Sequence, residues 1–356
     1  MPAEWETHTA TWLAWPHERT DWPGKFAPIP WVYADIVRHL SRFERVRILV
    51  QDRGEQNKAR DMLARSGANL AAVDFFVVPT NRGWTRDFAP IFLADSSAGN
   101  SGPGEGPSKI ALTNWRFNAW AKYDDWKKDD AATGRLIPKL AAAARSKKMR
   151  VWEPTHNGRR VVLEGGSIDV NGLGTLLTTE ECLLSKTQER NPGFVRADYE
   201  TVFREYFGAT NVLWLANGIV GDDTHGHVDD LARFVNPTTV VAVSEENRLD
   251  PNFEPLQENI VRLRKMKDQS GMPLRVETLP MPEPVFFAGQ RLPASYANFY
   301  IANRLVLVPT FSDFHDRIAV DKLAALFPDR AVVGIPCRDL VLGLGTLHCM
   351  TQQQPT

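Results

Sequence analysis

The chain has 356 residues, of which 42 are basic and 43 acidic, so its formal net charge is −1 at pH 7. This balance argues against a nucleic acid or an anionic membrane surface as a partner, because both bind proteins through an excess of positive charge. Three cysteines without a Cys-x-x-Cys pair exclude a disulfide framework and a structural zinc site of that type.

The first residues of the chain do not resemble a targeting segment. Glu4, Glu6 and His8 stand where a secretory signal needs a basic start and an unbroken apolar core. Charged residues or prolines also interrupt each apolar run well short of the roughly 18 residues that a membrane span requires. We therefore expect a cytoplasmic protein in a reducing compartment, with no membrane partner.

Short β-branched runs then alternate with amphipathic stretches along the whole chain. Residues 45–50, 55–67 and 73–79 read as strand, helix and strand. The pattern recurs as strand 109–115 with helix 131–145, strand 174–184 with helix 196–208, strand 238–244 with a helix on which Leu256, Ile260 and Leu263 share one face, and strand 303–310 with helix 321–328 and strand 330–336. About five such units, spaced by roughly 60–70 residues, predict an α/β fold in one domain, residues 1–356, built from repeated units.

Two segments suggest alternatives that we set aside. The Gly- and Ser-rich stretch 96–108 joins two strand-like runs, so we interpret it as a long hairpin loop rather than a linker between domains. The basic run 262–267 lies opposite the apolar stripe of its helix and is typical of a solvated face.

Four polar clusters place ionisable groups beside apolar or glycine-rich strand ends: 82–90, 163–169, 221–234 and 345–355. In the third cluster, a strand starting at His227 would point His227 and Asp229 to one face and Asp230 to the other. That spacing would put an acid/base imidazole next to a carboxylate.

The last cluster contains Cys349, close to a chain end that would normally fray. We interpret Cys182 and Cys337 as small buried hydrophobic residues, the commonest role of an isolated cysteine. Cys349 differs because it follows Gly343 and Gly345, which would let the backbone approach a ligand closely. A thiol becomes a useful nucleophile there only beside a cation or a base.

Together these clusters resemble the agmatine deiminase family, which is related to bacterial-type peptidylarginine deiminases within the guanidine-modifying (pentein) superfamily. The resemblance runs in order from residue 1 to about 355 and rests on these motifs: "MPAEWETHTATWLAWP", "WTRDFAP", "WRFNAW", "EGGSIDV", "GTLLTTEECLL", "RNPG", "GDDTHGHVDD", "LPASYANFYIAN", "VLVPTFSD" and "LHCMTQQQP". It implies a fivefold pseudosymmetric α/β propeller of ββαβ units, forming a single pentein catalytic domain with the active site on the central axis.

The resemblance also implies roles for individual residues. Cys349 matches the family's nucleophile, His227 its general acid/base, Asp87 and Asp229 its guanidinium-binding carboxylates, and Glu164 a carboxylate near the histidine. The implied substrate is a small guanidinium cation, most simply agmatine, which would be hydrolysed to N-carbamoylputrescine and ammonia through an S-amidino-cysteine intermediate. Neither a metal nor a cofactor is needed. A possible homodimer is the remaining expectation about partners.

Those residue types suit the chemistry. A guanidinium is planar, delocalised and permanently charged, so carboxylates on opposite edges can hold it through paired N–H···O bonds while its central carbon stays open to attack. Taken singly, each carboxylate also has a structural explanation: Asp87 as a turn residue before Pro90, Asp229 as a surface group, and Glu164 as a partner of Arg159 or Arg160.

Three alternatives remain. The run His225-Gly-His227-Val-Asp229 has the spacing of a metallohydrolase zinc site, although the chain offers no second ligand cluster. A non-catalytic binding module would lack the nucleophile or the base, and both are present. An arginine or peptidylarginine deiminase with the same chemistry is the closest rival.

The substrate's far end is the open question, because the chain departs from the family pattern there. His225 replaces an expected Asp or Asn, Ala121 an expected Gly, and "GLGTLHC" is bulkier than the expected "GGGNIHC". For an ammonium at that end, Asp223 and Trp84 are the candidate partners. A carboxylate or peptide group would instead call for a donor such as Arg116, and His225 would reshape the pocket if it faced it.

Overall fold

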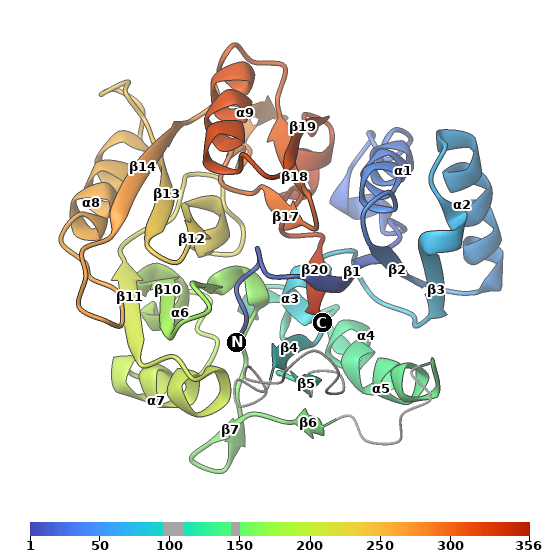
Figure 1. Cartoon of the computed structure of the whole chain (residues 1–356), viewed down its shortest axis with the longest axis horizontal. Coiled ribbons are helices and arrows are strands. Elements are labelled where there is room, and N and C mark those ends of the chain that lie inside the picture. The colour runs from blue at the N-terminus through green and yellow to red at the C-terminus, as the bar shows by residue number, and fades with distance from the viewer. Residues whose placement is uncertain (95–109, 144–149) are drawn as a thin grey trace.

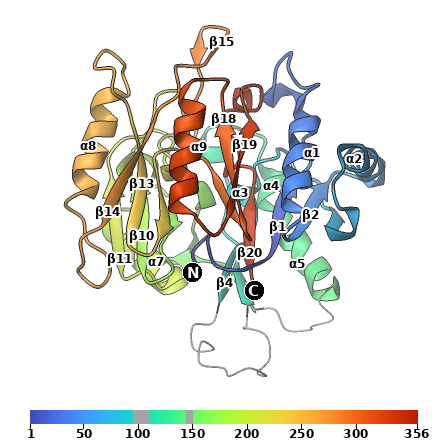
Figure 2. The ribbon, with the colours of Figure 1, turned by 45° about the horizontal axis from the view of Figure 1, so that its top comes forward.

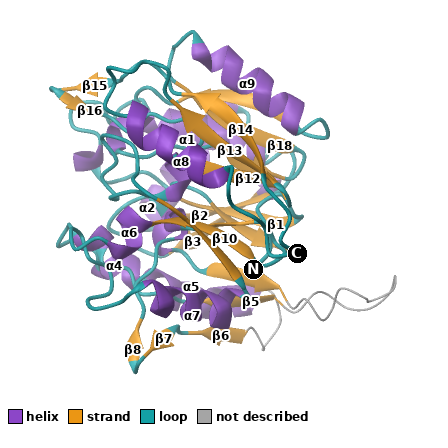
Figure 3. Cartoon of the chain, turned by 90° about the vertical axis from the view of Figure 1, so that its left-hand side faces the viewer, coloured by secondary structure: helices purple, strands orange, loops and turns teal. Residues whose placement is uncertain are grey.

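The computed structural model describes residues 1–94, 110–143 and 150–356. The predicted hairpin loop at 96–108 therefore lies outside the described residues. Strands and helices alternate along the chain in a mixed α/β fold, as the sequence predicts (Figure 1). Helices lie mainly on the outside and strands further in, as the view coloured by secondary structure shows (Figure 3).

Four sheets of the described residues share one strand pattern. In each, the middle strand pairs antiparallel with the strand before it and parallel with the strand after it. The sheets are β4 (Ile91–Ala94), β5 (Ile110–Thr113) and β6 (Arg150–Trp152); β9 (Asp169–Val170), β10 (Thr175–Thr179) and β11 (Asn211–Leu215); β12 (Ala232–Asn236), β13 (Thr239–Ser244) and β14 (Arg275–Pro280); β17 (Tyr300–Ala302), β18 (Leu305–Thr310) and β19 (Ala331–Pro336).

A further sheet repeats this pattern with strands from both ends of the chain. β1 (His8–Ala14) pairs parallel with β2 (Arg45–Val50), which pairs parallel with β3 (Val73–Val77). The antiparallel neighbour of β1 is β20 (Gln352–Pro355), so the two termini lie close together (Figures 1 and 2). This pairing explains why a reactive residue can stand so near the C-terminus: the segment is held by a buried strand.

Helices provide the crossovers between the parallel strands. They are α1 (Ile29–Leu40), α2 (Arg53–Ser66), α4 (Lys127–Asp130), α5 (Ala132–Ala143), α6 (Glu180–Leu184), α7 (Arg196–Phe207), α8 (Phe253–Leu263) and α9 (His315–Leu326). The short helix α3 (Thr85–Phe88) lies instead before β4, and two small hairpins complete the fold, β7 (Thr155–His156) with β8 (Arg159–Arg160) and β15 (Phe286–Phe287) with β16 (Gln290–Arg291).

Local sequence explains these boundaries. The side chain of Asp52 caps α2 by accepting a hydrogen bond from the Glu55 N–H, and Gly67 ends the helix with a φ of 79°. On α8 the predicted apolar face, Leu256, Ile260 and Leu263, is buried against the core. Arg262 pairs with Glu180 and Glu258, in agreement with a solvated face for the basic run.

Two predicted boundaries are wrong. The run 174–184 is a strand only as far as Thr179, whose hydroxyl accepts a hydrogen bond from the Cys182 N–H and so starts α6. Helix α9 begins at His315, six residues before the predicted start, because the Asp316 carboxylate accepts backbone N–H groups from Phe311 and Asp313 in the turn that precedes it. Among the described residues, every helix is too short or too polar to cross a lipid bilayer.

Candidate active site

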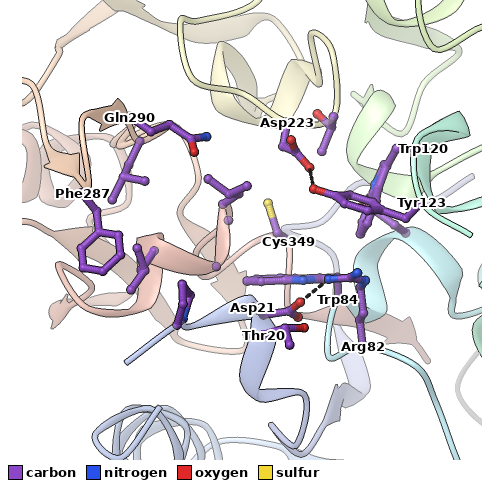
Figure 4. Close-up of a pocket in the computed structure, with 18 residues that line it drawn as sticks. Thr20, Asp21, Arg82, Trp84, Trp120, Tyr123, Asp223, Phe287, Gln290 and Cys349 are labelled. Atoms are coloured by element: carbon purple, nitrogen blue, oxygen red, sulfur yellow. Dashed lines mark hydrogen bonds and ion pairs between the residues drawn. The ribbon is translucent and has the colours of Figure 1, made fainter. Parts of the chain in front are cut away.

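A cavity of about 340 Å³ opens where the loops after several strands meet. Its walls include Trp84, Asp87, Trp120, Asp223 and Cys349, and Figure 4 shows the Cys349 sulfur pointing into it from between the aromatic side chains. The predicted nucleophile is therefore accessible from a pocket large enough for a small molecule, although the residue itself is only 5% exposed.

Glycine makes room for the nucleophile. A Cβ atom added at Gly345 would lie 3.0 Å from the Cβ of Cys349 and 3.0 Å from the Trp84 ring. The Sγ of Cys349 accepts a hydrogen bond from Asn298 Nδ2 at 3.1 Å and lies 3.7 Å from Asp229 Oδ2. A Cβ at Gly343 would likewise lie 2.7 Å from the Trp22 ring and 2.8 Å from the Trp84 ring, so both glycines permit close packing of this loop, while the close approach of a ligand stays a prediction.

His227 is fully buried, and three carboxylates surround its imidazole ring. Its Nδ1 is 3.9 Å from Asp87 Oδ1 and 3.9 Å from Asp229 Oδ1, and its Nε2 is 3.7 Å from Glu164 Oε2. Gly166 permits this packing, because a Cβ there would come within 2.5 Å of the imidazole.

Two of these carboxylates, Asp87 and Glu164, accept hydrogen bonds from other groups of the protein. Asp87, on α3, accepts hydrogen bonds from Trp120 Nε1 at 2.8 Å and from the Gly166 N–H at 3.1 Å. Glu164 accepts two from Arg190 Nε, at 3.0 and 3.3 Å. These contacts differ from the structural roles considered from the sequence. Asp87 binds Trp120 and Gly166 and is more than a turn residue before Pro90, and Glu164 pairs with Arg190 and not with Arg159 or Arg160.

The local geometry around His227 corrects one prediction. Val228–Asp230 forms a 3₁₀ turn, and strand β12 begins only at Ala232. His227 and Asp229 nonetheless face one site, as the alternating strand would have required. Asp230 does not point away: Asn298 Nδ2 also donates to its Oδ1, at 3.0 Å, and so links it to Cys349.

The electrostatics of the site oppose a free thiolate. Burial and the nearby Asp229, Asp230 and Asp87 raise the pKa of Cys349 well above its ordinary value, against the opposing hydrogen bond from Asn298. Burial also raises the pKa of Asp87 to about 6; His227 opposes that shift, and Asp229 adds to it. The site is therefore short of positive charge and suited to a cation.

His227 has the opposite tendency. Burial disfavours its imidazolium, but the negative charge of Asp87 and hydrogen bonding of the ring to Cys182 and Glu164, which act as acceptors, outweigh burial and hold its pKa well above the ordinary value. Burial likewise opposes ionisation of Glu164, yet Arg190 and His227 lower its pKa to about 2. These charges favour a protonated His227, which is linked to the Cys349 thiol through Asp229: Asp229 Oδ1 lies 3.9 Å from His227 Nδ1 and Asp229 Oδ2 lies 3.7 Å from Cys349 Sγ.

The predicted residues for the substrate's far end divide into two pairs. Trp84 and Asp223 line the cavity, where Asp223 pairs with Lys122 and accepts a hydrogen bond from the Tyr123 hydroxyl at 2.6 Å (Figure 4). The other two, His225 and Arg116, are absent from the cavity wall.

His225 and Arg116 make other contacts, which keep both side chains out of the cavity wall. His225 has a φ of 65° and turns its Nε2 to Ser185 Oγ at 2.9 Å, because the left-handed backbone before Gly226 redirects the side chain. The Arg116 side chain pairs with Asp130 at 2.9 Å and stacks on Trp126. Neither side chain lines the cavity in this structure, and their assignment to the substrate's far end stays a prediction from the sequence.

Several contacts of the site could not be predicted from the sequence patterns. Asn298, Trp120 and Arg190 each hold one of the catalytic groups, and only their place inside the motifs "LPASYANFYIAN", "WRFNAW" and "RNPG" could have suggested it. Cys182 is buried as predicted, but its sulfur also lies within 4.8 Å of ligand atoms of His227 and Glu164. A strand-and-helix pattern carries no information about such contacts between distant segments.

The metal-site alternative loses its predicted ligand set. His225 faces Ser185 and Glu181, so His225, His227 and Asp229 do not converge. Among the described residues, two other groups have donor atoms close enough to hold an ion: Glu164, Cys182 and His227, and Asp229, Asp230 and Cys349. Four of these six residues, Glu164, His227, Asp229 and Cys349, belong to the predicted catalytic set.

Comparison with known proteins identifies the family of the chain. The sequence profile of the family described as "Porphyromonas-type peptidyl-arginine deiminase" matches residues 1–355. Agmatine deiminase from Stutzerimonas stutzeri is 33% identical over 378 aligned positions, covering 100% of this chain and 95% of the relative. Among solved structures, agmatine deiminase from Enterococcus faecalis is 30% identical with a TM-score of 0.85, covering 100% of this chain and 95% of that one. Agmatine deiminase from C. jejuni with substrate bound is 28% identical with a TM-score of 0.84, covering 100% and 96%.

Proposed function

The chain belongs to the Porphyromonas-type peptidyl-arginine deiminase family, and from this premise we propose that it is a deiminase that hydrolyses agmatine to N-carbamoylputrescine and ammonia. One observation carries the proposal. Cys349 and Asp87 line one cavity, Asp229 lies 3.7 Å from the Cys349 sulfur, and His227 is buried next to Asp87, Asp229 and Glu164.

Substrate binding would create the nucleophile. A guanidinium held between Asp87 and Asp229 places a permanent positive charge next to the buried thiol, which offsets the carboxylates that suppress the thiolate. The Cys349 proton can then leave for solvent as the cation enters. Charge-assisted hydrogen bonds of roughly 1.5–3 kcal/mol each would fix the guanidinium plane and expose its central carbon to Sγ.

The first half of the reaction releases ammonia. The Cys349 thiolate forms a C–S bond to the guanidinium carbon and gives a neutral tetrahedral adduct. Protonated His227 transfers its proton to one amino group of that adduct, the C–N bond breaks, and ammonia departs. The product is a cationic S-amidino group on Cys349, which the same carboxylates can stabilise.

The second half restores the enzyme. His227, now neutral, takes a proton from a water molecule as the water oxygen bonds to the amidino carbon. The C–S bond of the second tetrahedral adduct breaks and releases the Cys349 thiolate, and the hydroxyl proton passes to solvent, giving a neutral urea-type product. Every step uses the side chains of the chain itself, with His227 acting first as acid and then as base.

Agmatine suits the outer part of the cavity better than arginine does. Agmatine ends in an ammonium, which could bind to an aromatic face such as Trp84 or share the Asp223 carboxylate with Lys122. The α-carboxylate of arginine would need a free donor. Arg82, which lines the cavity, already pairs with Asp21 and Asp125, and Arg116 lies elsewhere.

We also propose that the five similar sheets form a fivefold pseudosymmetric α/β propeller, a single pentein domain of residues 1–356. Support comes from the repeated strand pattern, in which one antiparallel and one parallel pairing flank the middle strand. In the sheet of β1, the antiparallel strand is supplied by the C-terminus, which is the connection that a ring of repeats would need.

The direct test is to measure ammonia release from agmatine, free arginine and a blocked arginine peptide in parallel. We expect the highest kcat/KM with agmatine. A clear preference for arginine or for the peptide would transfer the assignment to the rival deiminase activity. Absence of ammonia with all three substrates would refute the deiminase proposal.

A further inference from the structure

A buried ionic network lies behind the catalytic residues and begins at the fourth residue of the chain. The Glu4 side chain is almost fully buried, and its carboxylate is shared among three cationic groups. Oε2 accepts a hydrogen bond from Arg86 Nη2 at 3.1 Å and lies 2.8 Å from His348 Nε2, while Oε1 forms an ion pair with Arg233 at 2.9 Å. Glu4 thus connects the N-terminal segment to the residue that directly precedes the nucleophile.

His348 lies between two carboxylates. Its Nε2 is 2.8 Å from Glu4 Oε2, and its Nδ1 is 2.7 Å from Asp229 Oδ2. Ionised carboxylates only accept hydrogen bonds, so both ring nitrogens must carry a proton for both bonds to form. With Glu4 and Asp229 both ionised, this geometry points to an imidazolium at His348, which is 1% exposed.

The charge balance of the network supports the same protonation state. Its other cations are two arginines, and Arg233 also pairs with Asp169 at 3.2 Å. Three cations and three anions cancel only when His348 is charged, and an unbalanced buried charge is costly. The six groups are Glu4, Asp169, Asp229, Arg86, Arg233 and His348.

The network ends at the substrate site through Asp229. One carboxylate oxygen, Oδ2, binds His348 and lies 3.7 Å from Cys349 Sγ. The other, Oδ1, has no hydrogen-bond partner among the described residues and lies 3.9 Å from His227 Nδ1. His348 thus occupies one oxygen and leaves the other for a ligand.

We propose that His348 and Glu4 are positioning residues for the reaction: the His348 cation, held by Glu4, keeps Asp229 ionised and turned toward the guanidinium. This inference rests on the proposed deiminase function. It predicts that substrate binding depends on the charge of His348, which does not touch the substrate, and on the carboxylate of Glu4.

The test compares His348→Gln with His156→Gln in the full-length protein. Gln retains hydrogen bonding without charge, and His156 offers a matched control because its Nε2 pairs with Asp198 at 2.8 Å outside the cavity wall. For His348→Gln we expect the KM for agmatine to rise by roughly tenfold or more, equivalent to about 1.4 kcal/mol. The acid limb of its kcat/KM profile, to which Asp87 contributes in the wild type, should also change, because protonation of Asp229 is added once Asp229 loses the cation that favours its ionised form.

A purely structural role would give a different result. It would lower thermal stability or the yield of folded enzyme and leave the KM and the acid limb of the folded fraction unchanged, as we expect for His156→Gln. Unchanged values in His348→Gln, with active wild-type enzyme, would overturn the inference while leaving the deiminase proposal intact.

Two further measurements do not depend on turnover. Nitrogen NMR of the His348 ring should show a proton on both nitrogens, each hydrogen-bonded to a carboxylate, and a neutral ring would overturn the inference even if no substrate were found. Glu4→Gln combined with His348→Gln restores the charge balance of the network. The double variant should therefore lose less thermal stability than the sum of the two single variants, whereas additive losses would contradict the proposed coupling.

Discussion

Asn298 donates from one side-chain nitrogen to Cys349 Sγ at 3.1 Å and to Asp230 Oδ1 at 3.0 Å. Its carbonyl oxygen accepts hydrogen bonds from Thr346 Oγ1 at 2.8 Å and from the His348 N–H at 3.0 Å. One amide thus both fixes the loop that carries the nucleophile and supplies the hydrogen bond that favours its thiolate.

Replacing this amide should therefore weaken the nucleophile. For Asn298→Ala we expect kcat to fall by roughly ten- to a hundredfold, since a hydrogen bond to a charged group contributes about 1.5–3 kcal/mol. The pKa of Cys349 should rise further, because the Asn298 hydrogen bond now opposes the effect of burial. Alkylation of Cys349 by iodoacetamide, followed against pH, should shift to higher pH, and an unshifted profile would contradict this role.

Cys349 should be the only cysteine that turnover requires. Cys349→Ser should abolish ammonia release, and acid quenching of the wild-type enzyme during turnover should leave a mass increase on the Cys349 peptide. Cys337→Ala is the matched control, because Cys337 is buried outside the cavity wall. Appreciable turnover by Cys349→Ser would refute the covalent mechanism.

The same preparations test the metal alternative. Because the proposed steps use a thiolate and a histidine, EDTA should leave activity intact, whereas iodoacetamide should destroy it unless substrate is present. Loss of activity to the chelator, restored by Zn²⁺, would instead identify Glu164, Cys182 and His227 or Asp229, Asp230 and Cys349 as metal ligands.

The pH profile should report Asp87. With its pKa raised to about 6 by burial, this carboxyl group becomes neutral in the free enzyme as the pH falls through that value and loses its attraction for the guanidinium. We expect kcat/KM for agmatine to decline below about pH 6. The kcat limb should lie at lower pH, since bound cation favours ionised Asp87. Asp87→Asn should raise the KM at neutral pH and remove this limb.

Glu164 should set the basic limb. Its carboxylate lies 3.7 Å from His227 Nε2 and helps to hold the pKa of His227 well above the ordinary value. Glu164→Gln removes that anion, so His227 should lose its proton at lower pH, and the basic limb of kcat should move down. The change also leaves Arg190 buried without its partner, at a cost of about 3–5 kcal/mol in stability. Adding Arg190→Gln should restore stability but not the limb, and a limb that stays in place would exclude this role for Glu164.

Sequence patterns predicted the repeated α/β units because their signals are local. Buried strands such as β13 and amphipathic helices such as α8 depend on residues within one window, and their predicted positions are confirmed. The wrong boundaries arose where a side chain interrupted the pattern, as Thr179 does by capping α6.

The residues of the site likewise fall into those that a local motif indicates and those that only contacts between distant segments reveal. Cys349, His227, Asp87, Asp229 and Glu164 could be proposed from their motifs, and the structure brings all five together. Contacts such as Arg190 with Glu164 or Glu4 with His348 join segments far apart in sequence, so neither spacing nor periodicity reveals them. A homodimer remains a prediction from the sequence.

The last prediction concerns selectivity for the substrate's far end. From sequence, His225 replaces an expected acid, so His225→Asp would strengthen agmatine binding if residue 225 faced the pocket. In the structure it faces Ser185, while Asp223 lines the cavity. We therefore expect His225→Asp to leave the preference among agmatine, arginine and arginine peptides unchanged.

By contrast, Asp223→Asn should raise the KM for agmatine about five- to thirtyfold, equivalent to roughly 1–2 kcal/mol. The kcat should change much less, because the nucleophile and the guanidinium carboxylates are unaltered. Steady-state kinetics of both variants with the three substrates would decide. A lower KM for agmatine in His225→Asp would show that residue 225 reaches the substrate, and an unchanged KM in Asp223→Asn would show that the ammonium binds elsewhere.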